Sequence, residues 1–322
     1  MDRLRRCLIA GAMVMAGLLP LASSKGALAQ QASITFGSTN ATSSNYALAV
    51  AMSKAIKKAL PDRNVTMIET GASVDNIRRM VKGEINFGLV MADTIVMAKD
   101  GSGPFKGRAV EDLGVLYVHD VVTLQLVVRA DSGVNKLADL TGKKFSAGIR
   151  GSGAETLTRQ MFDIIGVKPQ FQPGSIQDAI EGTQNRQIVG YSKYGVGTGL
   201  DSTLRELLVS TPMRYLSFDE QQRAAITSRI KGVDFATVPA GTIPGQPAAT
   251  TPVVMATYSA RLSTMDNDTA FAVAKAINEN RQMLIDVFPH LKQMDFKAMA
   301  LKTEQLGLKL HPGAKKYWTS LP

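Results

Sequence analysis

The chain has 322 residues, enough for two domains, and its 45% hydrophobic and 20% charged residues are typical of a globular protein with a sizeable core. The formal net charge is +10, but no dense run of lysine and arginine with interleaved aromatic residues occurs, which argues against nucleic acid as a partner. The only cysteine, Cys7, lies near the N-terminus, and His119, His290 and His311 are not at metal-ligand spacing. The sequence therefore predicts no metal site, no cofactor and no cysteine nucleophile.

The N-terminal stretch 1–29 has the three parts of a secretory signal peptide. Three arginines form a basic start, an apolar run covers 7–21, and 27–29 reads Ala-Leu-Ala, which favours cleavage near Ala29. The apolar run is short for a membrane span. We therefore expect an exported protein that is soluble in the periplasm.

Strands and helices alternate directly after this leader. Strands are expected at 33–36, 64–69 and 85–90, with a helix to about Leu60 between the first two. A second helix follows Ser73, which suits its N-cap, and Gly83 ends it; its inward residues are expected to be Val74, Ile77, Met80 and Val81. The alternation predicts a parallel sheet with right-handed crossovers.

The middle of the chain repeats this alternation. The expected elements are a helical turn at 91–93, strands at 113–118 and 123–129, a helix within 131–144, a strand at Phe145, a helix that Gly166 ends, a strand at 170–172, a helix from Ser175, a strand at 187–191, helices from about Ser202 and over 218–230, a strand at 251–258, and a helical tail from about Asp266.

Two of these strands, 123–129 and 251–258, are expected to cross between two α/β lobes. The first lobe is then discontinuous, 30–122 plus 254–322, and the second covers 123–253. In open α/β sheets ligands bind beyond the carboxyl ends of the strands, so a ligand cleft is expected between the lobes.

Three loops between a strand and a helix share one chemistry: Gly37–Tyr46, Thr70–Asn76 and Gly148–Thr156. Each offers a helix N-terminus with serine or threonine nearby, and such N-termini attract anions. In the third loop Ser152 and Thr156 add hydroxyl donors and Arg150 adds a full charge. Plainer interpretations remain open at this point: a glycine turn that only connects, Ser73 as a helix cap, Tyr46 packed on its own helix, and Arg150 on the solvated surface.

Beyond these loops, an ordered series of segments carries a likeness to a known family. The segments are 36–38, 45–46, 69–76, 83–86, 92–93, 103–107, 128–133, 137–143, 151–153, 240–246 and 310–314. The chain resembles the TAXI family (TRAP-associated extracytoplasmic immunogenic proteins) of TRAP-transporter solute-binding proteins. The resemblance implies a type II periplasmic-binding-protein fold and delivery of a solute to a TRAP permease. It also implies that the pocket contains Ser38, Tyr46, Ser73, Asn76, Ser152 and Thr156, to which the loop chemistry adds Arg150.

The leading hypothesis is an extracytoplasmic solute-binding protein, not an enzyme. It is expected to act as a monomer, to capture a small carboxylate-bearing solute (an amino acid or a dicarboxylate-like molecule) and to pass it to a TRAP-type, ion-gradient-driven membrane permease. One alternative is a sensory binding protein that presents its ligand to a membrane receptor. Another is a periplasmic enzyme on the same fold, for which only Asp93 and Glu155 lie near the loops as acid or base.

Overall fold

The structure, a computed structural model, describes residues 33–322. The predicted signal peptide lies outside the described residues. Within them the strands are β1 (Ile34–Gly37), β2 (Val65–Ile68), β3 (Phe87–Met91), β4 (Leu113–Arg129), β5 (Lys144–Phe145), β6 (Gln170–Phe171), β7 (Gly190–Tyr194), β8 (Met213–Tyr215), β9 (Asp234–Val238) and β10 (Ala249–Arg261).

Helices alternate with these strands as far as β8 and then dominate the C-terminal part of the chain. They are α1 (Ser44–Ala59), α2 (Ser73–Val81), α3 (Ala92–Lys99), η1 (Gly103–Phe105), η2 (Leu137–Leu140), α4 (Gly153–Ile165), α5 (Ile176–Gln184), α6 (Ser202–Ser210), α7 (Glu220–Thr227), α8 (Asn267–Glu279), α9 (Arg281–Ile285), η3 (Pro289–Gln293), α10 (Phe296–Gln305) and α11 (Pro312–Ser320).

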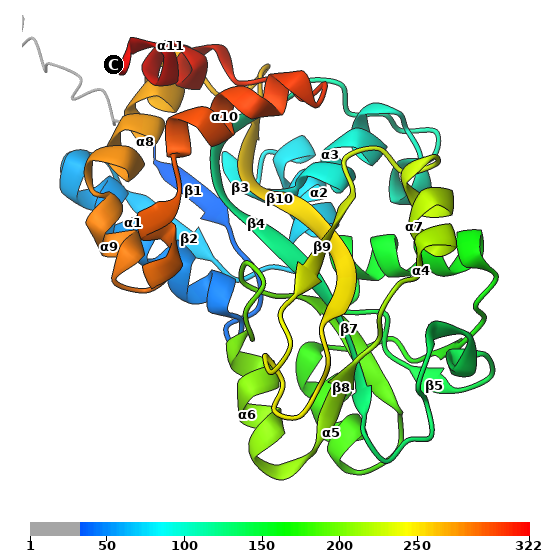
Figure 1. Cartoon of the computed structure of the whole chain (residues 1–322). Helices are drawn as coiled ribbons and strands as arrows, with labels where there is room; N and C mark the ends of the chain where they lie inside the picture. Colours follow the sequence, from blue (N-terminus) through cyan, green and yellow to red (C-terminus); the bar gives the residue numbers. More distant parts are fainter. Residues whose placement is uncertain (1–32) are drawn as a thin grey trace, which may run out of the picture. The chain divides into compact units, whose positions relative to one another are not determined.

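A single large sheet runs through the described chain in the order β2-β1-β3-β10-β4-β7, with β8 beside β4 and β9 beside β10 (Figure 1). β1 is parallel to both β2 and β3, as the alternation predicts. β10 is antiparallel to β3 and to β4, and β7 is antiparallel to β4. The short strands β5 and β6 form a separate parallel pair.

The long strands β4 and β10 join two α/β lobes, which confirms the predicted fold class. The first lobe contains β1, β2, β3 and the helices packed on them, and the second contains β5 to β8 with α4, α5 and α6. The pairing of β4 with β10 extends from Leu113 opposite Arg261 to Thr123 opposite Val253. The residue limits proposed for the lobes, 30–122 plus 254–322 and 123–253, stay a prediction.

The separation of 113–118 from 123–129 was wrong, because β4 is one continuous strand of 17 residues. The polar residues His119 and Asp120 suggest a break, yet both are buried and have partners. His119 Nε2 lies 3.2 Å from Asn45 Oδ1, and Asp120 Oδ2 accepts the Gly197 N–H at 3.0 Å. Neighbours distant in sequence bond to one ring nitrogen of His119 and to the Asp120 carboxylate, so these polar residues can lie inside a continuous strand.

Ser73 is not the N-cap of α2, contrary to the prediction. Ala72 holds that position with φ of 66°, and its side chain makes no capping hydrogen bond. Ser73 is the first helical residue, and its Oγ accepts the Met91 N–H at 3.1 Å, which ties α2 to the end of β3. Val81 is 48% exposed and does not face the core.

Three further element predictions need correction. The stretch 131–144 contains only the 3₁₀ turn η2 instead of a helix, and α7 is shorter than 218–230. β7 begins at Gly190 instead of at 187, because the N–H groups of Gln187 and Ile188 bond back to Gly182. Pairing with β4 therefore sets the limits of β7.

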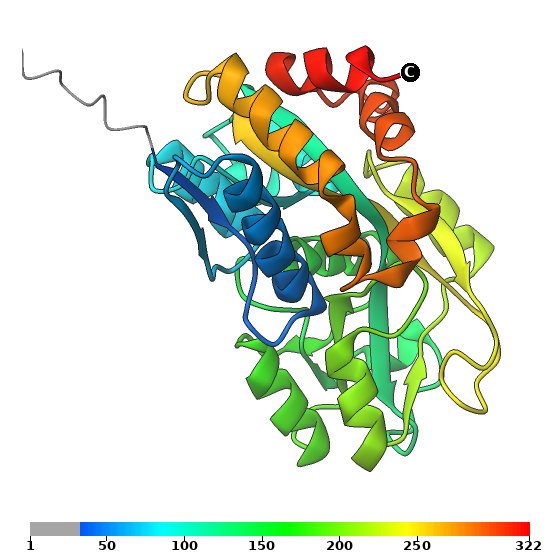
Figure 2. The ribbon, with the colours of Figure 1, turned by 90° about the vertical axis from the view of Figure 1, so that its left-hand side faces the viewer.

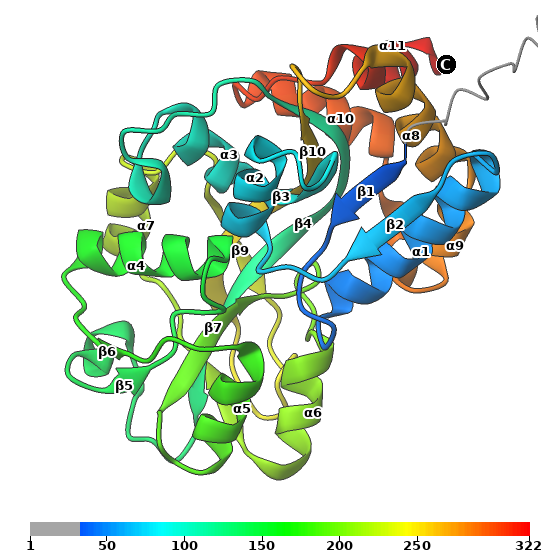
Figure 3. The same cartoon turned by 180° about the vertical axis from the view of Figure 1, so that it is seen from behind.

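Helices cover both faces of the sheet in the first lobe. α1 and α8 lie side by side although they are far apart in sequence (Figure 2). α2 and α3 lie on the face seen from behind (Figure 3). Phe36 and Phe87 stack with ring centroids 4.8 Å apart, and Tyr258 packs edge-on against both rings. This aromatic group ties β1, β3 and β10 together.

The C-terminal helix α11 is anchored by Trp318, which is fully buried and donates its Nε1–H to the Leu116 carbonyl at 2.8 Å. We expect Trp318→Ala to lower the free energy of unfolding by about 3–5 kcal/mol, because it leaves a large cavity in the core. Trp318→Phe should cost less, about 1–3 kcal/mol, mainly by leaving that carbonyl without its donor.

Urea unfolding followed by circular dichroism measures both losses. Val209→Ala is the control, since Val209 is 88% exposed and its loss should change stability by no more than about 0.5 kcal/mol. If Trp318→Ala proved no more destabilising than this control, the anchoring role would be wrong.

Candidate functional site

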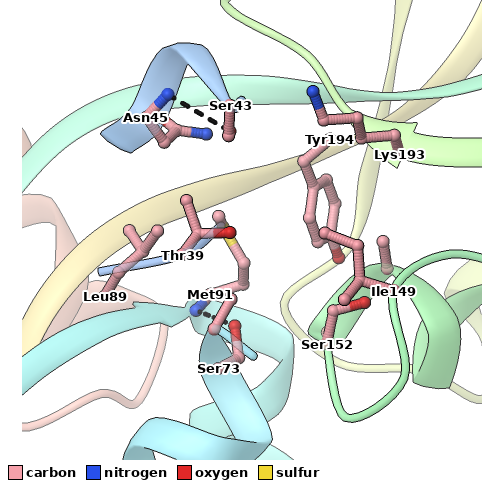
Figure 4. A pocket seen from close by; sticks show the side chains of 13 residues that line it. Thr39, Ser43, Asn45, Ser73, Leu89, Met91, Ile149, Ser152, Lys193 and Tyr194 are labelled. Atoms are coloured by element: carbon pink, nitrogen blue, oxygen red, sulfur yellow. Dashed lines mark hydrogen bonds between the residues drawn. The ribbon is translucent and has the colours of Figure 1, made fainter. Parts of the chain in front are cut away.

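A small cavity lies where the predicted loops of the two lobes meet (Figure 4), and we call it the central cavity. Its lining consists of Thr39, Ser43, Asn45, Ala72, Ser73, Leu89, Met91, Ile149, Ser152, Gly153, Ala154, Lys193 and Tyr194. The volume is about 30 Å³. That is enough for water, which needs about 10–15 Å³, but far below the roughly 300 Å³ or more of small-molecule sites. A solute therefore requires the walls to move apart.

Three helices point their N-termini at the central cavity. Ser43 is the N-cap of α1 and Ser152 is the N-cap of α4, while Ser73 opens α2. The backbone N–H groups at such ends carry partial positive charge, which favours an anion or a strong hydrogen-bond acceptor. α1 and α2 come from the first lobe and α4 comes from the second, so both lobes contribute.

The hydroxyl groups of these serines are already used as acceptors. Ser43 Oγ accepts the Asn45 N–H at 3.3 Å, Ser73 Oγ accepts the Met91 N–H at 3.1 Å, and Ser152 Oγ accepts the Glu155 N–H at 3.1 Å. A serine hydroxyl still has one proton to donate. Within residues 33–322 no hydrogen bond uses the protons of these three serines, so each hydroxyl could still donate to an acceptor.

Gly153 allows the lobes to approach closely at this point. A Cβ atom on Gly153 would lie 2.8 Å from Thr94 Oγ1 and 3.1 Å from Ser73 Oγ. The distance to Thr94 is shorter than real Cβ atoms make and the distance to Ser73 is unusually tight, so a larger residue would require these side chains or their helices to shift. The glycine of the third loop is therefore explained by close packing between the lobes.

A buried carboxyl group adjoins the cavity. Asp93 is 1% exposed, and Tyr194, which lines the cavity from the second lobe, donates its O–H to Asp93 Oδ2 at 3.3 Å. Burial raises the pKa of Asp93 to about 7, although hydrogen bonds from Thr94 and Tyr194 oppose the shift. Asp93 is not the N-cap of α3, a position that Met91 holds. Its contact with Tyr194 instead links the lobes.

Asn45 is held in place from behind the cavity. Burial lowers the pKa of His119 to about 4, so its ring is neutral near pH 7 and donates from Nε2 to Asn45 Oδ1. This bond orients the Asn45 amide group, which lines the cavity. The sequence offered no signal for this pairing, because the two residues are 74 positions apart.

Of the predicted site residues, Ser73 and Ser152 line the central cavity, and two others support it. Asn76 is buried and donates from Nδ2 to the carbonyls of Ser38 at 2.9 Å and Leu89 at 2.8 Å. It thereby ties the residue that follows β1 to the middle of β3. Ser38 is itself fully buried beside this contact.

The remaining predicted residues lie outside the lining. Tyr46 is half-buried on α1, Arg150 is exposed, and Thr156 Oγ1 donates to the Ser152 carbonyl at 3.2 Å. Their contact with a ligand stays a prediction. Lys193 and Asn45 were not identified as site residues from the sequence. The strand expected at 187–191 ends before Lys193, and in the first loop only the serine and threonine hydroxyls were considered as donors, not the Asn45 amide.

A larger hollow of about 630 Å³ adjoins the first loop on its outer side, and we call it the outer hollow. It is lined by Ala41, Thr42, Ser43, Ser44, Ala47, Val196, Leu200, Ser202, Arg205, Glu206, Val287, Phe288, Pro289 and His290. It shares Ser43 with the central cavity. The residue next to Ser43 joins the lobes at this hollow. The hydroxyl groups of Ser44 and Ser202 lie 3.1 Å apart, and the Ser202 N–H donates to Ser44 Oγ, also at 3.1 Å.

Residues 33–322 contain no group of three or more histidine, cysteine, aspartate or glutamate side chains arranged to hold a metal ion. Within the same range, none of the helices combines the length and apolar character needed to cross a bilayer.

Solved structures with a similar architecture include a protein of Xanthomonas citri bound to a chloride ion, which is 10% identical over 89% of this chain and 99% of that chain, with a TM-score of 0.50. The alkanesulfonate-binding protein of Xanthomonas axonopodis pv. citri, bound to MOPS, is 15% identical over 91% of this chain and 86% of that chain, with a TM-score of 0.49. A TRAP periplasmic solute binding protein of Sulfitobacter sp. NAS-14.1, with bound β-D-galacturonate, is 10% identical over 90% and 96%, with a TM-score of 0.47.

At these identities the likeness concerns the fold alone. The family assignment comes from a protein-family model, described as NMT1-like, that matches residues 36–320. The match begins in β1 and ends in α11, and so includes both lobes and every residue that lines the central cavity. The chain therefore belongs to the NMT1-like family.

Proposed function

We propose that this protein is an extracytoplasmic solute-binding protein without catalytic activity, which captures a small carboxylate-bearing solute such as an amino acid or a dicarboxylate. One observation carries the proposal: serines at the N-termini of α1, α2 and α4 meet at one cavity between the lobes with their hydroxyl protons unused. A carboxylate accepts such bonds on both oxygens and brings the negative charge that helix N-termini favour.

Binding would proceed by separation and closure of the lobes. The central cavity is too small for an amino acid, while the outer hollow next to it is open and large enough. The contacts of Ser44 with Ser202 and of Asp93 with Tyr194 join the lobes on either side. A solute enters when these contacts part and is enclosed when they form again.

The proposed location is the periplasm, and the proposed partner is a TRAP-type membrane permease that uses an ion gradient. The leader pattern in 1–29 supports export. The ordered series of segments typical of the TAXI family supports the permease class, and a monomer is the proposed state. The predicted ligand residues Ser38, Tyr46, Ser73, Asn76, Ser152 and Thr156 belong to this proposal. Arg150, which is exposed and outside the lining of the central cavity, is predicted from the sequence alone and is compared with Lys193 by mutation.

An enzyme on the same fold is the less favoured alternative. Catalysis requires an acid or base that reaches the bound molecule. Asp93 is buried against Tyr194 and does not line the central cavity. Glu155 accepts the Gly151 N–H at 2.8 Å and pairs with Arg159, so it stabilises its own loop and helix.

The proposal predicts stabilisation by the correct solute. At a concentration a hundred times the dissociation constant, a bound solute should raise the free energy of unfolding by about 2.7 kcal/mol. Thermal unfolding across a library of amino acids, mono- and dicarboxylates, sulfonates and neutral sugars measures this. If only sulfonates stabilised the protein, the proposed ligand class would change from carboxylates to sulfonates. If no small molecule stabilised it, solute binding itself would be contradicted.

Ser152 supplies a prediction with a matched control. We expect Ser152→Ala to weaken binding of the stabilising carboxylate about tenfold or more, since a hydrogen bond to a charged group contributes about 1.5–3 kcal/mol. The same change removes an N-cap and should lower stability by about 1 kcal/mol.

Ser175→Ala is the control, because Ser175 caps α5 outside the central cavity. It should lose similar stability and no affinity in isothermal titration calorimetry. Equal affinities in the two variants would remove Ser152 from the site.

The raised pKa of Asp93 predicts that the free energy of unfolding depends on pH. Its folded pKa of about 7 lies above the ordinary value of 3.8, so the folded state binds the proton more tightly than the unfolded state. The contribution of this proton to the free energy of unfolding is complete below pH about 4 and is lost as pH rises toward about 7. Over that range the free energy of unfolding falls by up to about 1.4 kcal/mol per pH unit. Asp93→Asn should remove this loss.

Urea unfolding of the wild type and of Asp93→Asn between pH 4 and pH 8 tests the sign. Relative to the wild type, the variant should become progressively more stable as pH rises. A difference that stays constant over this range would show that Asp93 has no raised pKa.

A further inference from the structure

Lys193 is the one charged side chain in the lining of the central cavity, among the residues that the structure describes. It lies on β7, where it pairs with Gln125 of β4, and it is 5% exposed. In Figure 4 its ammonium end lies at the upper edge of the lining, on the side of Ser43 and Asn45. A buried lysine in this position requires a reason, because burying a charge is costly unless it is paired.

The partners of the ammonium group account for two of its three protons. Lys193 donates to Asp201 Oδ2, and it donates to Thr203 Oγ1 at 2.7 Å. The described part of the chain offers the third N–H no hydrogen-bond partner. Because Lys193 is one of the residues that line the cavity, this remaining donor is the group that a carboxylate bound there could take up.

Asp201 is held rigidly in its place. Its Oδ1 accepts the Leu204 N–H at 2.9 Å as the N-cap of α6, and the residue is 2% exposed. The next residue, Ser202, makes the contacts with Ser44 that join the lobes. The ion pair of Lys193 and Asp201 thus lies between the central cavity and a contact that would part when a solute enters.

We propose that Lys193 is the charge partner of the bound solute, donating its third N–H to a carboxylate oxygen, and that Asp201 limits the charge that this end of the site accepts. The inference rests on the proposed function and names the class of ligand group. A single negative charge is attracted by Lys193 and by three helix N-termini. A doubly charged group such as phosphate is disfavoured by Asp201.

This assignment replaces the role that the sequence suggested for Arg150. Arg150 is exposed and lies outside the lining, whereas Lys193 is buried within it. A charge in a buried site discriminates more strongly between an anion and its neutral analogue, because solvent screens it less. The two cations can therefore be compared directly by mutation.

The test uses acetate and its neutral analogue acetamide as probes, with binding to the mature protein measured by isothermal titration calorimetry. The wild type is expected to bind acetate at least tenfold more tightly than acetamide. Lys193→Met together with Asp201→Asn should reduce this preference at least several-fold, leaving only the part that the three helix N-termini supply. The double change keeps the site neutral, and asparagine can still cap α6.

Two single variants sharpen the result. Asp201→Asn alone leaves the lysine charge uncompensated and should strengthen acetate binding at least tenfold. Arg150→Gln should leave acetate binding unchanged. Circular dichroism and the thermal midpoint establish that each variant is folded before its affinity is compared.

Several outcomes would overturn the inference. They are an equal affinity of the wild type for acetate and acetamide, an unchanged preference in the Lys193 and Asp201 double variant, or a tenfold loss in Arg150→Gln alone. Solute binding itself fails by a different result, namely the absence of stabilisation by any molecule in the library. A wild type that binds only neutral solutes would keep solute binding but remove both the carboxylate and the role of Lys193.

Discussion

The antiparallel pairing of β4 with β10 is the constraint on which the rest of the structure depends. Both strands run from the first lobe into the second, and Thr251 adds a side-chain hydrogen bond to the Leu124 carbonyl near the crossing. β3 attaches to β10 at one end, and β7 and β8 attach to β4 at the other. Because these strands carry the helices, their pairing decides which helix N-termini meet.

The meeting of three helix N-termini has an electrostatic cost as well as a use. Partial positive charges of the same sign gather at one cavity, and no carboxylate lines it among the described residues. The serine hydroxyls relieve part of this cost by accepting backbone N–H groups, and Gly153 permits the close approach of α4. An anion placed in the cavity would relieve the remainder. This electrostatic arrangement is what the proposed capture of a carboxylate would use.

Two polar side chains in the middle of the crossing strand β4 bond to neighbours from several elements. Asp120 accepts from the Gly197 N–H and lies 3.0 Å from His290 Nε2, and His119 bonds to Asn45. These residues fall in the middle of β4, where a run of apolar residues is interrupted. Read along the chain they indicate a loop between two strands. In the fold they are buried contacts between the crossing strand and the elements around it.

The sequence by itself determined the features that depend on near neighbours. The alternation of strands and helices, the glycine that ends α4, the serine cap of α5 and the three loops with hydroxyl groups follow from patterns within a few residues. Only the tertiary structure decided that Ser73 binds the end of β3, that Lys193 lines the cavity and that Arg150 is exposed. The reason is physical: burial and hydrogen-bond partners at these positions come from segments far along the chain, and pairing with β4 and β10 brings those segments together.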